Sequence, residues 1–127
     1  LVGDACAFLD PVFSSGVMLA LKSGQLAAEE VHRGLNEGDL SPERFSAYGA
    51  TVRQGVENMR KLVYAFYNPN FSFREVIRKH PEAAGLITDC LSGDVNKDFT
   101  QLWDWFREFV PLPDDLPYGM PFTGRDE

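Results

Sequence analysis

The sequence has 127 residues, the length of one ordinary domain, and its 44% hydrophobic and 24% charged residues are typical of a folded globular chain. Nineteen acidic residues against twelve basic ones give a formal net charge of -7, which excludes a general basic surface for nucleic acid. No apolar run approaches the ~20 residues of a membrane span. Cys6 and Cys90 lie far apart with no secretory leader, which favours reduced thiols and a cytoplasmic location.

The first five residues, Leu1 to Ala5, predict the end of a strand followed by a turn. Leu1-Val2 is interpreted as the carboxyl end of a buried strand, and Gly3-Asp4 as the turn where open α/β sheets bind their ligands. A strand needs neighbours for its backbone hydrogen bonds, and later residues offer almost no strand pattern. We therefore expect a carboxyl-terminal fragment of a longer chain, with the sheet encoded upstream.

A loop over residues 7–16 is predicted to lead into the first helix. Pro11 biases Asp10 away from helical angles, and Ser14, Ser15 and Gly16 are cap-type residues before an apolar run. The helix is expected to end at Gly34 to Gly38. Its predicted buried stripe consists of Val17, Ala20, Leu21, Gly24, Ala27, Ala28, Val31 and Leu35. The small residues in mid-stripe favour close approach of a sheet or a cofactor.

A second, long helix of about 24 residues is predicted from Ser41-Pro42-Glu43 to Asn68-Pro69, since Ser, Pro and an acid are typical of a helix start. An aromatic cluster begins at the end of this helix. We predict that it belongs mainly to the core, and its members are Tyr64, Phe66, Tyr67, Phe71 and Phe73.

Shorter helices are predicted in the remaining sequence. Ser72 and Glu75 fit a capping box for a helix that closes at His80-Pro81, and Pro81-Glu82 opens another that reaches Leu91. A last helix from about Asn96 is expected to bury one face, formed by Phe99, Leu102, Trp103, Phe106 and Val110. From Pro111 onward the prolines predict an extended tail on the surface.

The chemistry is concentrated in residues 1–28. Asp4 offers a carboxylate that can accept hydrogen bonds from sugar-type hydroxyls, and the loop offers backbone at close range. The helix that follows Gly16 offers free N–H groups carrying about half a positive charge.

This block resembles the second FAD-binding motif of the flavoprotein monooxygenase and reductase superfamily, and within it the flavin-dependent halogenases that act on phenols and pyrroles. The matching residues are Gly3, Asp4, Ala5, Phe8, Asp10, Pro11, Ser14, Ser15, Gly16 and Val17. The resemblance implies a mainly α fragment, the carboxyl-terminal helical region of an α/β FAD-binding fold of the glutathione-reductase/hydroxylase type. Residues 1–38 would end the FAD-binding domain, and 39–127 would form a helical region with a proline-rich tail.

The resemblance also implies a set of cofactor contacts with FAD: Gly3, Asp4, Asp10, Pro11, Ser14, Ser15, Gly16, Val17 and Met18. Asp4 would bond a ribityl hydroxyl, and the amides of 14–18 would face the pyrimidine edge of the flavin. A helix N-terminus there stabilises reduced flavin by about 0.3 to 2 kcal/mol. Ser15 and Gly16 would neighbour the halide.

Two departures from the family pattern stand out. Met18 occupies the place where these halogenases commonly carry His, and a thioether donates no hydrogen bond. The nucleotide fingerprint, the Trp-x-Trp-x-x-Pro motif and the catalytic Lys would lie upstream, so we assign no catalytic residue in this chain. Trp103-Asp104-Trp105 is interpreted as core packing, and the two cysteines with His32 and His80 lack metal-ligand spacing.

The predicted function is therefore part of an FAD-dependent oxidoreductase, a halogenase or monooxygenase acting on an electron-rich small molecule, and inactive as a fragment. Its partners would be FAD, the substrate, a halide and the upstream part of the same chain. Two alternatives remain open: an FAD-dependent isoprenoid reductase of the geranylgeranyl type, and a helical interaction module without catalysis.

Overall fold

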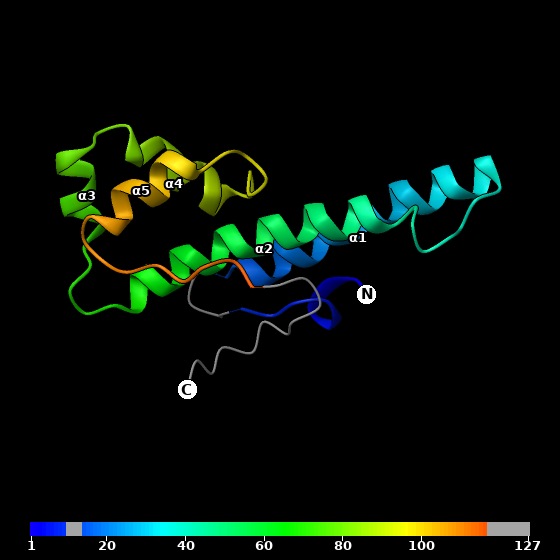
Figure 1. Cartoon of the computed structure of the whole chain (residues 1–127), viewed down its shortest axis with the longest axis horizontal. Coiled ribbons are helices and arrows are strands. Elements are labelled where there is room, and N and C mark those ends of the chain that lie inside the picture. Colours follow the sequence, from blue (N-terminus) through cyan, green and yellow to red (C-terminus); the bar gives the residue numbers. More distant parts are fainter. Residues whose placement is uncertain (10–13, 117–127) are drawn as a thin grey trace.

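The computed structural model describes residues 1–9 and 14–116, and within these ranges it contains helices and no strand (Figure 1). The prediction of a mainly α chain is confirmed. The elements in chain order are the short 3₁₀ turn η1 (Gly3–Ala5), α1 (Ser15–Glu37), α2 (Ser46–Tyr67), α3 (Phe73–Lys79), α4 (Ala83–Ser92) and α5 (Thr100–Arg107). None of the described helices is long and apolar enough to cross a membrane.

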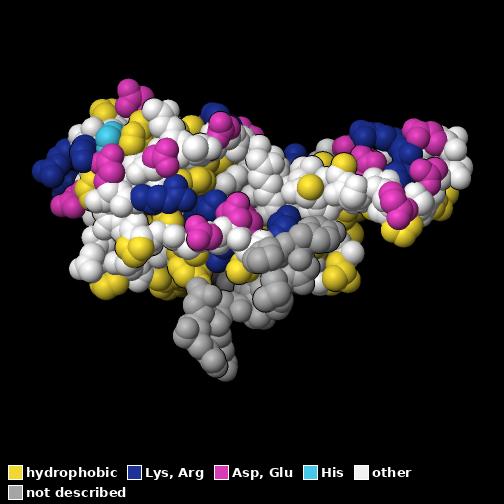
Figure 2. Space-filling model, in the orientation of Figure 1, with side chains coloured by type: hydrophobic (Ala, Val, Ile, Leu, Met, Phe, Trp, Pro, Cys, Tyr) yellow, Lys and Arg dark blue, Asp and Glu magenta, His cyan; other side chains and the backbone are white. Residues whose placement is uncertain are grey.

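Helices α1 and α2 form a long antiparallel hairpin whose connecting turn projects away from the other helices (Figures 1 and 2). α1 ends as predicted, because Gly38 takes the left-handed conformation with φ 70° and donates its N–H to the carbonyl of Gly34. A Cβ on Gly34 would lie 2.6 Å from the carbonyl oxygen of Asp39, so only glycine permits this return of the chain. Arg44 pairs with Glu37 across the turn, at 2.5 Å.

The start of α2 differs from the prediction. Its first residue is Ser46, and residues 42–45 form successive turns in which the N–H groups of Arg44 and Phe45 bond the carbonyls of Ser41 and Pro42. Ser41 provides no side-chain cap; its own amide is bonded by the carboxylate of Asp39, at 2.9 Å. The helix ends before Asn68-Pro69, as expected.

Helices α3, α4 and α5 lie where helices were predicted, but the starts of α3 and α5 differ from the predicted ones. Ser72 flanks α3 without a side-chain cap, and the Glu75 N–H bonds the Ser72 carbonyl instead of forming a capping box. α5 begins at Thr100, later than the predicted Asn96. The reason is that the 95–96 loop is fixed to α2, with Asn96 Nδ2 donating to the Thr51 carbonyl at 2.6 Å.

The hydrophobic core lies where α3, α4 and α5 pack on the second half of α2. The predicted face of α5 is buried as expected, and Trp103 donates its Nε1–H to the buried amide of Asn58 at 3.1 Å. The buried core residues are Met59, Leu62, Ala65, Val76, Ala83, Ile87, Cys90, Val95, Phe99, Leu102, Trp103, Phe106 and Val110.

The aromatic residues at the end of α2 are less buried than predicted. Tyr64, Phe66 and Tyr67 are 37%, 41% and 56% exposed, because the core-facing positions of this turn are Val63 and Ala65. Phe71 and Phe73 do pack against the core. Trp105 does not lie in the core either: it is half-buried, packs against the edge of the core and stacks on His80 with ring centroids 4.7 Å apart.

A buried ion pair on α2 holds the segment 111–116, which runs along this helix as an extended strap (Figure 1). Glu57 and Arg60 have side chains only 5% and 6% exposed, and they pair at 2.8 Å. Glu57 Oε1 accepts the N–H of Leu116 at 3.0 Å, and Arg60 donates to the carbonyl of Asp114 at 2.6 Å. The predicted extended course after Pro111 is confirmed as far as residue 116.

We expect Glu57→Gln to lower the free energy of unfolding by about 3 kcal/mol, because it leaves the buried Arg60 guanidinium without its counter-charge. Equilibrium urea unfolding measures this. The matched control is Asp104→Asn, which breaks an ion pair of the same i,i+3 spacing with Arg107 whose side chains are 65% and 45% exposed. Its effect should stay within about 0.5 kcal/mol. Equal effects for the two variants would contradict the role of burial.

Candidate functional site

The chain start forms a compact turn after an extended Val2. The interpretation of Leu1-Val2 as a strand end stays a prediction, because its sheet was expected upstream. Leu1 is 87% exposed, and no strand lies in the described residues to pair with Leu1-Val2. Val2 does have the extended backbone of a strand residue, with φ -139° and ψ 149°. Gly3 then turns left-handed at φ 64°, and its carbonyl accepts the N–H of Cys6 at 2.8 Å. A side chain at Gly3 would be strained in this conformation.

Ser23 fastens this turn to α1. The N–H of Gly3 donates to Ser23 Oγ at 2.9 Å, and the Ser23 hydroxyl donates to the carbonyl of Ala20 at 3.0 Å. Ser23 itself is 4% exposed. A Cβ on Gly3 would lie 3.7 Å from the Cβ of Ala20, and one on Gly24 would lie 3.8 Å from Val2. The backbone of the Gly3–Ala5 turn therefore lies close to the small residues of α1.

Asp4 lies in this turn with its side chain available to a ligand. It is exposed, and its carboxylate makes no hydrogen bond or ion pair with the residues that the structure describes. An exposed carboxylate can accept hydrogen bonds from two hydroxyls of a polyol. The ribityl contact of Asp4 stays a prediction.

The N-terminus of α1 is the second element of the site. Ser14 flanks it with φ 52°, a left-handed conformation that costs a non-glycine residue about 1 to 2 kcal/mol. The Ser14 side chain makes no capping hydrogen bond to the helix. Ser15 is 5% exposed, and its Oγ has no hydrogen-bond partner among the described residues. The first amides of a helix have no partner within it, so amide donors, the positive end of the helix dipole and a hydroxyl that no described residue bonds coincide here.

An open hollow of about 510 Å³ lies beside this helix terminus. Its floor includes Met18, whose side chain covers Gly93 at the end of α4: a Cβ on Gly93 would be 3.2 Å from Met18 Cγ. Lys22 brings a cation that forms no ion pair within the described residues. The lining residues are Ser14, Val17, Met18, Leu21, Lys22, Gln25, Ser92 and Gly93.

The buried face of α1 is not the predicted one. Val17, Leu21 and Leu35 are 71%, 71% and 64% exposed. The face towards α2 instead carries Leu19, Ser23 and Leu26. Both faces are apolar in sequence, and α2 covers one of them. The exposed stripe, Val17, Leu21, Val31 and Leu35, is an apolar surface of the kind that usually marks an interface.

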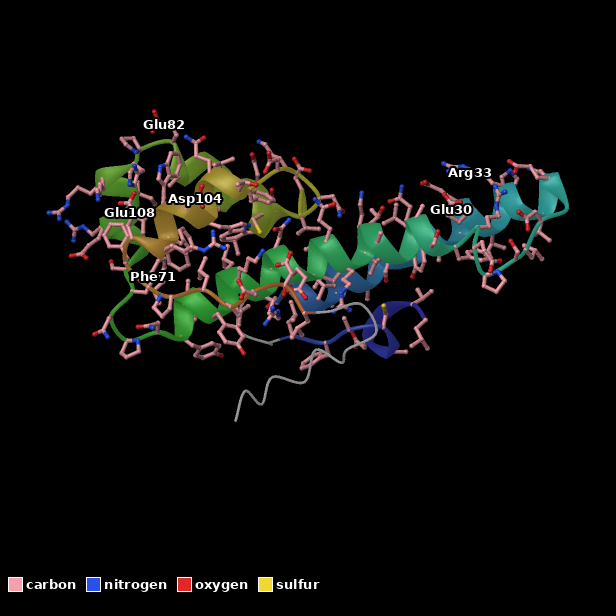
Figure 3. The ribbon with its side chains drawn as sticks, in the orientation of Figure 1. Glu30, Arg33, Phe71, Glu82, Asp104 and Glu108 are labelled. Carbon is pink, nitrogen blue, oxygen red and sulfur yellow. The ribbon has the colours of Figure 1, made fainter. Side chains whose placement is uncertain are left out.

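Titratable clusters outside this site do not suggest a second one. Burial raises the pKa of the Cys90 thiol to about 12, so it is an inert core residue. Hydrogen bonds from Lys79 and His80 lower the pKa of Glu108, at the end of the molecule far from the α1–α2 turn (Figure 3). Among residues 1–9 and 14–116, no three His, Cys, Asp or Glu side chains lie together as a metal site would require.

The structure thus brings Gly3 and Asp4 onto α1, the helix whose first turn contains Ser15 to Met18. Asp10 and Pro11, also predicted contacts, lie outside the described residues. Sequence reasoning missed Ser23, Lys22 and Gly93. Ser23 had a detectable signal, because it falls three residues after Ala20 and four before Ala27 in the small-residue part of the helix.

The family model "Tryptophan halogenase" matches residues 1–76, which contain η1, α1 and α2. A 1H-pyrrole-2-carbonyl-[peptidyl-carrier protein] chlorinase from Pseudomonas fluorescens is 34% identical over 92% of this chain. Two digeranylgeranylglycerophospholipid reductases match less of it: 30% identity over 62% for that of Methanocella arvoryzae, and 32% over 45% for that of Thermoplasma acidophilum.

The chain spans 26% of the length of the chlorinase and 18% and 14% of the two reductases. No solved structure matches it. The match to the chlorinase, at 92% of the chain, extends well beyond the residues that the family model covers.

We expect Gly93→Ala to destabilise the chain by about 1 to 3 kcal/mol, since Gly93 has φ 106° and a Cβ there would press on Met18. Gly85→Ala is the matched control on the same helix: nothing lies within 4 Å of its added Cβ. That change should stabilise by up to about 1 kcal/mol. Thermal and urea unfolding give both values, and a neutral Gly93→Ala would refute the proposed Met18 contact.

Proposed function

The chain belongs to the tryptophan halogenase family, and from this premise we propose that it forms the flavin-binding part of an FAD-dependent, halogenase-type oxidoreductase. The proposal rests on one observation: two groups that can bind a ligand, the Asp4 carboxylate and the α1 N-terminus, are supported by the same helix. The Gly3–Ser23 hydrogen bond holds the turn that contains the exposed Asp4 against α1, the helix whose N-terminus begins after Ser14 without a cap from the Ser14 side chain.

The residues present fit FAD. Asp4 provides an acceptor for ribityl hydroxyls, and the orphan, buried Ser15 Oγ marks a polar position at the α1 N-terminus that no described residue satisfies. When bound, FAD supplies the electrons and the dioxygen activation of such an enzyme. The first amides of α1 would lie at the pyrimidine edge of its ring and favour the negative charge of the reduced form.

The same helix terminus is our proposed halide neighbourhood, through the backbone amides of Ser15 and Gly16. Backbone N–H groups at a helix N-terminus bind anions without a charged side chain. Met18 occupies the next turn and packs on Gly93, so it contributes shape instead of a proton. Gly3, Ser14 and Val17 complete the proposed contacts, together with Asp10 and Pro11.

The domain assignment, the substrate and the remaining partners are also proposals. Residues 1–38 would end an FAD-binding domain, and residues from 39 onward would form a helical region beside it. The exposed stripe of α1 gives the rest of such a domain an apolar surface to cover. The substrate is proposed to be an electron-rich small molecule, in keeping with the pyrrole named for the chlorinase relative, and the location to be cytoplasmic. Catalytic side chains would come from outside this chain.

A second candidate is an FAD-dependent isoprenoid reductase, which the digeranylgeranylglycerophospholipid reductase relatives support. Their matches cover 62% and 45% of the chain, against 92% for the chlorinase. The broader match favours the halogenase. A helical module without catalysis would bind no flavin, so the spectrum of the purified protein discriminates it from both enzymes.

In the protein expressed from its complete reading frame, we expect Asp4→Ala to weaken FAD binding by about 10- to 100-fold, the value of a hydrogen bond to a charged group. Fluorescence titration of the apoprotein measures it. Glu82→Ala is the control, since this exposed acid lies beside α3 and α4 (Figure 3) and should leave the affinity unchanged. Unchanged binding by Asp4→Ala would sink the role assigned to Asp4.

The reaction itself is tested with reduced FAD, dioxygen and either chloride or bromide. We expect halide-dependent products from a pyrrole or phenol, recognised by their isotope pattern in mass spectrometry. Saturation of an isoprenoid double bond without halide incorporation would establish the reductase instead.

A further inference from the structure

Ser23 is a buried hydroxyl in the middle of α1 with both of its hydrogen-bonding functions in use. It is 4% exposed, accepts the Gly3 N–H at 2.9 Å and donates to the Ala20 carbonyl at 3.0 Å. Because its one proton is committed to Ala20, its lone pairs are directed to the chain beyond the helix. The hydroxyl rotor is thereby fixed, and with it the position of the Gly3 amide.

This link is the only hydrogen bond between η1 and α1 among the described residues. Elsewhere the turn approaches its neighbours through apolar groups, since a Cβ added at Gly3 would meet Ala20 and one added at Gly24 would meet Val2. The Tyr48 hydroxyl donates to the Leu1 carbonyl at 2.8 Å, at the edge of the turn. Apolar contacts permit sliding by a fraction of an ångström, whereas a hydrogen bond has a preferred length and direction. Ser23 therefore fixes the register of the turn along the helix.

The position of the turn along α1 matters because both proposed flavin contacts, Asp4 and the α1 N-terminus, are supported by this one rigid helix. Ser23 follows Ser15 by two turns, about 12 Å along the helix axis. Asp4 directly follows the amide that Ser23 holds, and the free amides at Ser15 begin the helix. The spacing between the Asp4 carboxylate and the α1 N-terminus is thus set through Ser23.

We propose that Ser23 is a positioning residue for the cofactor, which holds Asp4 at the distance from the α1 N-terminus that one flavin requires. This inference rests on the proposed function. Ser23 touches no cofactor atom in this scheme; it acts through Gly3 and Asp4.

The test compares Ser23→Ala, Ser23→Thr and Ser46→Ala in the protein from the complete reading frame. Ser46→Ala is the matched control, because its Oγ bonds a carbonyl three residues earlier, as Ser23 does, but tethers no second segment. FAD affinity is measured by fluorescence titration, the flavin environment by visible circular dichroism, and the Gly3 amide by hydrogen–deuterium exchange in the apoprotein.

We expect Ser23→Ala to lose exchange protection at Gly3, to bind FAD about tenfold more weakly and to alter the flavin dichroism. Ser23→Thr should restore all three, and Ser46→Ala should change none. In an Asp4→Ala background, Ser23→Ala should add less than a twofold loss, because it acts through the residue already removed.

The results distinguish a failure of the proposed function from a failure of the positioning role of Ser23. A wild-type protein that binds no FAD refutes the proposed function, whatever the exchange data show. A wild-type protein that binds FAD while Ser23→Ala keeps its affinity and dichroism refutes the positioning role alone. A fully additive loss in the double variant, or a loss that Ser23→Thr fails to restore, also overturns the inference.

Discussion

The rest of the structure depends on a charged segment of α2 that is buried on every side. From Gly55 to Val63 each residue of this helix is inaccessible, including Glu57, Asn58, Arg60 and Lys61. Burial of a charge costs several kcal/mol unless it is paired and hydrogen-bonded. Glu57, Arg60 and Asn58 find those partners in one another, in the strap and in Trp103. This requirement places the strap against one side of α2 and α5 against another, while α1 occupies a third.

Helix ends were predictable and the buried face of α1 was not, for a physical reason. Gly38, Gly93 and Asn68-Pro69 end their helices through backbone chemistry that is local to the sequence. The buried face of α1 depends on where α2 packs, which is set by contacts distant in the sequence. The pair Val17 and Leu21 and the pair Leu19 and Leu26 both have helical spacing, so periodicity alone does not tell which of the two faces is buried. The start of α2 was missed because Asp39 bonds the Ser41 amide, a competition that the motif Ser-Pro-Glu does not reveal.

The candidate site, too, was predictable from the sequence only in part. Its ligand-type residues, Asp4 and the α1 N-terminus, were legible from residue types and spacing. What joins them was harder to predict, because the Gly3–Ser23 bond spans 20 residues and only the place of Ser23 among the small residues of α1 marked it. The left-handed Ser14 and the buried Ser15 hydroxyl, which no described residue bonds, were equally invisible, since backbone conformation and burial arise only in the folded chain. They are also typical of a site shaped for something other than the stability of the chain.

The strap has a consequence for how the molecule assembles. The contact between Leu116 and Glu57 closes a loop of 59 residues, whereas the α1–α2 turn brings together Gly34 and Asp39. Closing a long loop costs more chain entropy than closing a short one, so local pairs form early and distant ones late. We therefore expect the strap to pack after the hairpin. In that order Glu57 and Arg60 give up water only when the carbonyl of Asp114 and the N–H of Leu116 replace it.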